Sequence, residues 1–216
     1  MEKKQKHMIA AAITALVVIV GFLAVQIIAQ KLLMNDGIKY LEKKEYDKAY
    51  ECFQKAEKKH TIFTSKKNIQ YYEGESLIYL GRYEDAAKIY GKIVKKHKEA
   101  KAYALQGFSY QQNGEKKKAL ACYKNAVKAD EKNGIGYYYL YGYYVEEKEY
   151  KKALETIEQA LQVPVEEEKQ KLEFAQIVVY EKMLKFDKAL EVAKKYVKAY
   201  PEDEAGKQEK EFLETR

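Results

Sequence analysis

Residue types that commonly carry catalysis or bind metals are scattered along this chain. The three histidines are His7, His60 and His97, and none has a second His or Cys at the spacing that metal ligation requires. The serines lack the glycine-rich turn that exposes a nucleophile, and the glycines recur at repeat spacing instead of forming a phosphate-binding loop. No two carboxylates stand out as an acid and base pair. We therefore expect no catalytic residue, metal site or cofactor, and we predict that the protein is not an enzyme.

The two cysteines, Cys52 and Cys122, occupy the same position in copies of a recurring pattern, two copies apart. Stacked repeats separate such positions by more than the roughly 7 Å that a disulfide allows between Cα atoms. We expect two free thiols, which says little about the redox compartment.

Composition favours a folded helical protein. The chain has 216 residues, of which 47% are hydrophobic and 34% charged, and it carries a formal net charge of +7. Lys and Glu are mixed along its length, so the basic total indicates a solvated surface and no nucleic-acid partner. Weak attraction to anionic lipid headgroups or cell-wall polymers stays open. The 21 tyrosines include a run in residues 137–144 that places rings on every side of a helix, so some must face a neighbour and others a ligand or solvent.

One short pattern recurs five times and organises the chain. Its first copy is Tyr46, Ala49, Phe53 and Ala56, in which an aromatic residue is followed by a small, a large and a small residue. The alanines of the five copies are Ala49, Ala86, Ala119, Ala153 and Ala189, between 33 and 37 residues apart. A period near 34 residues is typical of stacked helix–turn–helix units.

Each unit is expected to contain two helices. The second begins near the recurring pattern, whose residues form one buried stripe. The first carries a glycine twelve residues before the alanine in three copies, so we interpret Gly37 as a close-packing site inside a helix and not as part of a turn. The predicted repeat limits are 30–63, 67–99, 100–133, 134–167 and 170–203, with a longer connection through residues 61–65. Residues 204–216 are expected to form a capping helix.

Residues 8–29 contain no charge, and a helix of that length rises about 33 Å, enough to cross a bilayer. A cleaved signal peptide is the alternative, but its apolar region is usually shorter, and Ile27 precedes the best cleavage point after Ala29. We expect an uncleaved signal-anchor behind a basic cytoplasmic tail, residues 1–7. Lysines flank both sides of the segment, but long domains translocate largely regardless of charge, so we expect the carboxyl-terminal domain outside the cytoplasmic cell membrane.

The five copies resemble the tetratricopeptide repeat family, in which a small residue is followed by Tyr after three positions and by Ala after twelve. The resemblance covers about residues 30–203. It departs from the family pattern at Tyr141 and Ile177, where the small residue is lost, and at Lys116 and Ala193, where the aromatic is lost. The predicted fold is all-α: a transmembrane helix, a right-handed α-solenoid of about five repeats and a capping helix.

The resemblance implies a concave groove lined by the first helices that binds extended or helical peptides. The positions that it assigns to this groove are Met34, Ile38, Tyr71, Ile78, Phe108, Tyr138, Val145, Phe174 and Val178. The Lys and Asn that hold a ligand carboxylate in chaperone-binding members are missing from the matching rows, so an acidic carboxyl-terminal tail is not the expected ligand. We expect an amphipathic or aromatic segment of a partner protein, bound by a scaffold at the cell envelope.

Other interpretations remain open. The inner rows could be covered by the array's own curvature or by the capping helix. The protein could instead be a structural spacer or a self-associating envelope protein without a peptide ligand. The tyrosine rows could also stack on sugars of a wall polymer. The sequence does not name the partner or the oligomeric state.

Overall fold

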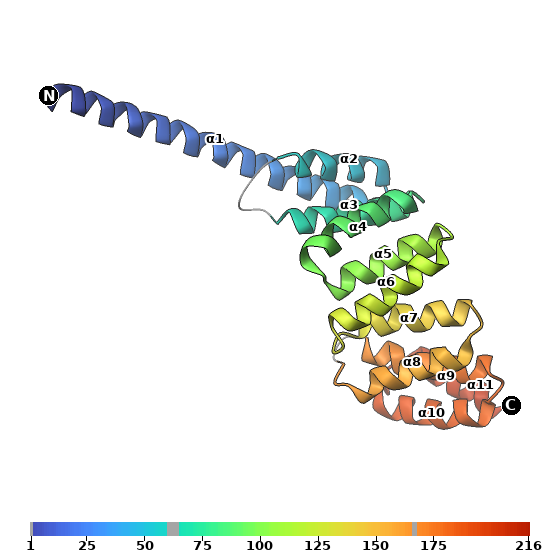
Figure 1. The fold of residues 1–216 in the computed structure, drawn as a ribbon. Helices are drawn as coiled ribbons and strands as arrows, with labels where there is room; N and C mark the ends of the chain where they lie inside the picture. Colours follow the sequence, from blue (N-terminus) through green and yellow to red (C-terminus); the bar gives the residue numbers. More distant parts are fainter. Residues whose placement is uncertain (1, 60–64, 166–167) are drawn as a thin grey trace. The chain divides into compact units, whose positions relative to one another are not determined.

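The computed structural model describes residues 2–59, 65–165 and 168–216, and all regular elements in this part are α-helices (Figure 1). The all-α fold predicted from the repeats is confirmed. His60 and most of the predicted longer connection, residues 61–64, lie outside the described residues. The chain divides into two compact units, a first unit of Met1–Ile89 and a second unit of Tyr90–Arg216.

The first unit begins with α1 (Glu2–Glu42), followed by α2 (Tyr46–Glu57) and α3 (Lys66–Tyr79). α4 (Tyr83–His97) begins in this unit. α1 is continuous through Gly37, as expected, and its amino-terminal part extends away from α2 and α3 in Figure 1. It is the one helix in the described part that is long and apolar enough to cross a membrane. A signal sequence would have the same character.

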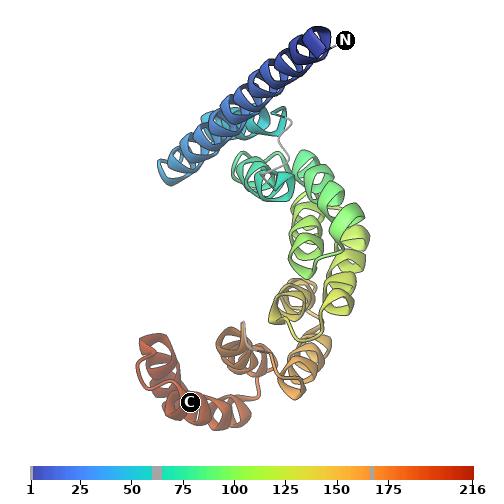
Figure 2. The same ribbon diagram turned by 90° about the vertical axis from the view of Figure 1, so that its left-hand side faces the viewer.

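The second unit continues with three hairpins and a last helix. Its helices are α5 (Ala100–Gln112), α6 (Lys116–Ala129), α7 (Gly134–Glu146), α8 (Tyr150–Gln162), α9 (Lys169–Lys182), α10 (Phe186–Ala199) and α11 (Glu204–Glu214). They lie side by side in chain order in Figure 2. α8 and α10 each end two residues before a proline, Pro164 and Pro201 respectively, because proline cannot continue a helix.

The two helices of a hairpin interlock through one small and one large residue. A Cβ on Gly37 would lie 2.6 Å from the Phe53 ring, and a Cβ on Gly107 would lie 2.6 Å from the Tyr123 ring. The five alanines of the pattern are all fully buried. Only glycine therefore lets the aromatic ring of the second helix reach the backbone of the first.

Where the glycine is lost, the partner residue changes size. Ile177 replaces the glycine in the last hairpin, and Ala193 replaces the aromatic, and both are fully buried in one cluster. Exchanging large and small residues conserves the filled volume. In the preceding hairpin these two positions hold Tyr141 and Ile157, and Tyr141 packs against the buried cluster that contains Ile157. Ile157 is fully buried, whereas Tyr141 is only half-buried.

All five hairpins turn in the same way. The left-handed residues, five positions before the buried alanine, are Lys44, Gly81, Gly114, Lys148 and Leu184. In the last turn, Lys185 N donates to Tyr180 O at 2.9 Å and Leu184 N donates to Glu181 O at 2.8 Å. The same pair of bonds closes the other four turns, so each first helix ends in a Schellman motif.

A second device joins the two helices in four hairpins. A lysine near the start of the second helix lies over a tyrosine ring near the end of the first, eight residues earlier. The pairs are Tyr40–Lys48, Tyr110–Lys118, Tyr144–Lys152 and Tyr180–Lys188, with 5.1 to 5.9 Å between Nζ and the ring centroid. Sequence reasoning missed these cation–π pairs, although the constant spacing of eight residues was visible.

Replacing Leu184 with Gly is expected to stabilise the second unit. Leu184 has a φ of 58° and its side chain is 76% exposed, so the change removes backbone strain and loses little burial. We expect the free energy of unfolding to rise by about 1 kcal/mol, measured by urea titration of the full chain in detergent. Leu184→Ala keeps the Cβ and should show no such gain; an equal gain in both variants would contradict the strain argument.

Gly107→Ala and Gly142→Ala should act in opposite directions. The new Cβ at Gly107 meets the buried Tyr123 ring, whereas nothing lies within 4 Å of a Cβ at Gly142. We expect Gly107→Ala to destabilise the unit by about 1–3 kcal/mol. Gly142→Ala should stabilise it by about 0.5–1 kcal/mol because alanine favours helix. Thermal unfolding followed by circular dichroism measures both, and two shifts of the same sign would refute the interlock.

Candidate functional site

All nine predicted groove residues lie on first helices and are half-buried. Met34 and Ile38 lie on α1, Tyr71 and Ile78 on α3, Phe108 on α5, Tyr138 and Val145 on α7, and Phe174 and Val178 on α9. Four belong to the first unit and five to the second, so the two sets are described separately. Their role in partner binding stays a prediction.

In the first unit the predicted residues contribute to packing. Met34 and Ile38 pack against the buried cluster that contains Phe53 and Ile69. Part of their surface is therefore already used to hold α1 against α2 and α3. Only the remaining surface of these two residues is open to a partner.

In the second unit the structure brings Tyr138 and Phe174 together at one hollow of about 400 Å³. We call it the aromatic hollow. Its lining residues are Tyr138, Tyr141, Gln170, Lys171, Phe174, Ala175, Tyr196, Asp203 and Ala205. They come from α7, α9, α10 and the start of α11. The other predicted residues of this unit, Phe108, Val145 and Val178, do not line it.

One end of the aromatic hollow is a closed polar network. Gln170 Nε2 donates to Tyr196 Oη at 3.1 Å and to Asp203 Oδ2 at 3.0 Å, and the Tyr196 hydroxyl also donates to Asp203. Asp203 additionally caps α11 by accepting from the amides of Ala205 and Gly206. The hydrogen bond from Tyr196, followed by that from the Gly206 amide, lowers the pKa of Asp203. The carboxylate is thus a charged structural acceptor and a poor general base.

The other end of the hollow is aromatic and carries one cation. The Tyr138 ring meets the Tyr141 ring edge-on at 5.4 Å between centroids, and Lys171 Nζ lies 5.6 Å from the Tyr138 centroid. Lys171 also pairs with Glu168 at 2.7 Å. Burial first, and then the charge of and a hydrogen bond with Tyr138, raise the pKa of Tyr141, so its hydroxyl stays protonated and is already engaged with Tyr138. The surface can therefore receive an apolar side chain and offer a few polar contacts beside it.

Sequence reasoning missed Gln170, Lys171 and Asp203. Asp203 had a recognisable signal, because an aspartate directly before a helix is a preferred N-cap. Tyr141 appeared only as a departure from the repeat pattern. That departure is what supplies the hollow with a ring, since the buried Ile157 occupies the place of the aromatic.

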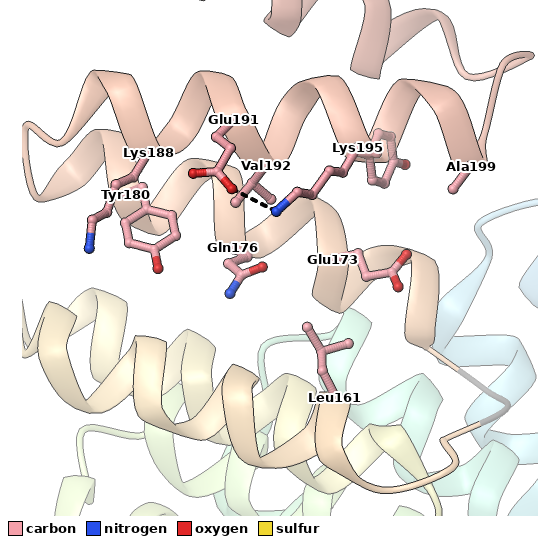
Figure 3. Close-up of a pocket in the computed structure, with 10 residues that line it drawn as sticks. Leu161, Glu173, Gln176, Tyr180, Lys188, Glu191, Val192, Lys195 and Ala199 are labelled. Carbon is pink, nitrogen blue, oxygen red and sulfur yellow. Dashed lines mark hydrogen bonds and ion pairs between the residues drawn. The ribbon is translucent and has the colours of Figure 1, made fainter.

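A second hollow of about 520 Å³ lies between α8, α9 and α10 (Figure 3). Glu173, Gln176 and Tyr180 reach it from α9, and an ion pair between Lys195 and Glu191 of α10, at 2.7 Å, crosses its rim. None of the nine predicted residues lines it. It is larger than the aromatic hollow, but each of its charged groups already has a partner: Glu191 and Lys195 pair with each other, Glu173 pairs with Lys169 at 3.9 Å, and Lys188 lies over the Tyr180 ring.

Two carboxyl groups meet where α9 faces α11. Burial first, and then a hydrogen bond and repulsion from Glu209, raise the pKa of Glu181 to about 7, while the positive charges of Lys182 and Arg216 oppose the rise. A proton on Glu181 therefore favours the packed position of α11. Since α11 supplies Ala205 to the aromatic hollow, protonation supports one wall of the site.

The two cysteines are free in the structure, as expected. Burial raises the pKa of Cys122 to about 11, so its thiol is not a reactive nucleophile at neutral pH. Across the described ranges, no three His, Cys, Asp or Glu residues converge in a way that could hold a metal ion.

The packing of α11 should weaken as pH rises. The folded pKa of Glu181, about 7, lies above the unfolded value of about 4.3, so the stabilisation is complete below that unfolded value and is lost as pH rises through 7. We expect the amides of α11 to be less protected from hydrogen exchange at pH 8 than at pH 6, after correction for intrinsic rates. Glu181→Gln should remove the difference. Glu211→Gln, on the exposed side of α11, should keep it.

Comparisons with known proteins agree with this fold. Residues 69–100 match the sequence model of the tetratricopeptide repeat. No curated protein matches the chain. Three similar solved structures are a thermophilic TPR protein of Thermus thermophilus, MamA of Desulfovibrio magneticus, and YrrB, described as a TPR protein with an unusual peptide-binding site.

These structures are similar in fold and distant in sequence. The Thermus protein is 18% identical, with 87% of this chain and 100% of that chain covered and a TM-score of 0.63. For MamA the identity is 19%, the coverage 82% and 97%, and the TM-score 0.60. For YrrB the identity is 17%, the coverage 83% and 90%, and the TM-score 0.55. The predicted resemblance is confirmed: the chain has the fold of tetratricopeptide-repeat proteins and carries a recognisable tetratricopeptide repeat at residues 69–100.

Proposed function

We propose that the protein is a membrane-anchored scaffold that binds a peptide segment of a partner protein at the aromatic hollow. The observation that carries the proposal is the convergence of Tyr138, Tyr141 and Phe174 on one open surface. Half-buried rings of this kind commonly anchor interfaces, because they bury much area and lose little conformational entropy. The peptide-binding site named for YrrB supports the same use of this fold.

The chemistry of the hollow favours a segment with an aromatic or leucine side chain. The rings of Tyr138 and Phe174 offer apolar contact, while the Lys171 ammonium can contact a backbone carbonyl. Asp203 and Gln170 already bond to each other and to Tyr196. In this proposal residues 30–203 form the binding array, and the capping segment 204–216 also contributes a wall of the site.

The membrane part of the proposal rests on α1. The side chains of residues 8–25 are exposed along the helix, and this stretch rises about 27 Å, close to the hydrocarbon thickness of a bilayer. Such an apolar surface is unfavourable in water. We infer that α1 anchors the protein in the cell membrane with the carboxyl-terminal domain on the extracytoplasmic side.

Removing the rings should weaken partner capture and leave the fold intact. We expect Tyr138→Ala and Phe174→Ala each to weaken binding about 30-fold, which corresponds to about 2 kcal/mol for an interface anchor. The partner is first identified by crosslinking the intact protein in its own membrane, and affinity is then measured with the partner segment. Phe212→Ala is the control, because Phe212 is exposed on α11 outside the hollow.

Helical content by circular dichroism must stay unchanged in all three variants. Unchanged capture by Tyr138→Ala and Phe174→Ala would overturn the proposal. A concentration-dependent dimer in sedimentation, with no segment bound, would point to self-association instead.

A further inference from the structure

We propose that the carboxyl-terminal end of α2 lies on the bilayer surface and that lysines around it bind anionic lipid headgroups. The basic collar consists of Lys31, Lys58 and Lys59. The proposal rests on the membrane anchoring proposed for α1 and adds a lipid-binding surface to it. All of the residues involved belong to the first unit.

The first observation is a buried amide that joins α1 to the end of α2. Gln30 is only 2% exposed, and its Nε2 donates to Ala56 O and to Lys59 O, both at 2.9 Å. Both carbonyls belong to the last turn of α2 and the residues directly after it. The end of α2 is therefore held beside residue 30 of α1, at one height along the helix axis.

The second observation is the change in exposure along α1. Every described side chain from residue 7 to residue 25 is exposed, whereas Gln26, Ile27 and Ala29 are partly covered and Gln30 is buried. The apolar surface available to lipid is therefore complete up to residue 25 and continues beyond it on one face only, through Ile28 and Leu32. The protein's own packing begins within about 8 Å of that point, since five residues of helix separate residue 25 from residue 30. The end of α2 thus lies at the level of the lipid headgroups.

The third observation is the charge at this level. Lys31 and Lys58 are exposed and Lys59 is half-buried, and all three lie next to Gln30 or to its acceptors. The nearby carboxylate Glu57 is already bonded, accepting from Lys66 at 3.4 Å and from Gln70 Nε2 at 2.7 Å. The collar therefore presents a positive charge that this carboxylate does not cancel.

The Gln30 amide also weakens a charge effect that would oppose lipid binding. The carbonyls at the end of a helix carry partial negative charge and would repel phosphate groups. Gln30 donates to one of them, Ala56 O, and to the carbonyl of Lys59 directly after the helix. Each lysine close to an anionic membrane surface contributes about 1 kcal/mol of attraction. Together the three offer positive charge to lipid phosphates, and in this proposal the spanning helix holds them at the depth of the headgroups.

The test uses the full chain reconstituted in vesicles that contain equal parts of phosphatidylcholine and phosphatidylglycerol. Lipids that stay with the protein after gentle extraction are quantified by mass spectrometry. We expect phosphatidylglycerol to be enriched at least threefold over phosphatidylcholine. This threshold is set below the roughly fivefold enrichment that corresponds to about 1 kcal/mol from one lysine. K31Q/K58Q/K59Q should lower the phosphatidylglycerol enrichment toward the level that the amino-terminal lysines alone produce. Those lysines are retained in all variants.

K39Q/K43Q/K44Q is the matched control. It removes the same charge from exposed lysines of the first unit, about 12–20 Å further along the helix direction from Lys31. The control should keep the wild-type enrichment. Equal losses in the two triple variants, or no loss in either, would overturn the collar.

Membrane insertion is measured separately, by testing whether the protein stays in the vesicles after an alkaline wash. If the protein is washed off, the proposed membrane anchoring fails and the collar fails with it. If the protein stays inserted and shows no difference between the variants, only the collar fails.

Discussion

The fit between a small residue on one helix and a large residue on the next is the constraint on which the hairpins depend. At Gly37 and Gly107 the absence of a side chain lets a ring from the second helix reach the backbone of the first. A short helix with one apolar stripe is unstable alone, so this contact provides what local helix propensity does not. The uniform Schellman turns and the tyrosine–lysine pairs then hold the two helices in one register.

The candidate site arises where that fit changes. In the fourth hairpin Ile157 occupies the buried place of an aromatic, and Tyr141 stands where a glycine is usual. In the fifth, the aromatic moves to Tyr196, which Gly206 of α11 accommodates, with 2.5 Å between a Cβ there and the ring. Residues that depart from the repeat pattern thus build the aromatic hollow. A repeat protein gains a specific surface by local changes of side-chain size while the stacking stays the same.

The amino-terminal helix links the array to its proposed membrane setting. Because α1 is continuous from Glu2 to Glu42, the apolar stretch and the first packed helix are one rigid element. Gln30 joins this element to the end of α2 through two hydrogen bonds at a buried position. Such a junction orients the first hairpin relative to the anchor without a flexible linker. This orientation is what would place particular lysines at a lipid surface.

The sequence alone determined the all-α fold, the helix pairs and the glycine inside α1, because these follow from periodicity and from residue size at fixed spacing. It also placed Tyr138 and Phe174 on first helices, where the structure has them half-buried. It did not reveal that they share a hollow with Tyr196 and Asp203, because those residues come from other helices and from side-chain packing between repeats. The Gln30 junction likewise joins residues 26 positions apart. Contacts between elements depend on the three-dimensional fit of side chains, which only the tertiary structure decided.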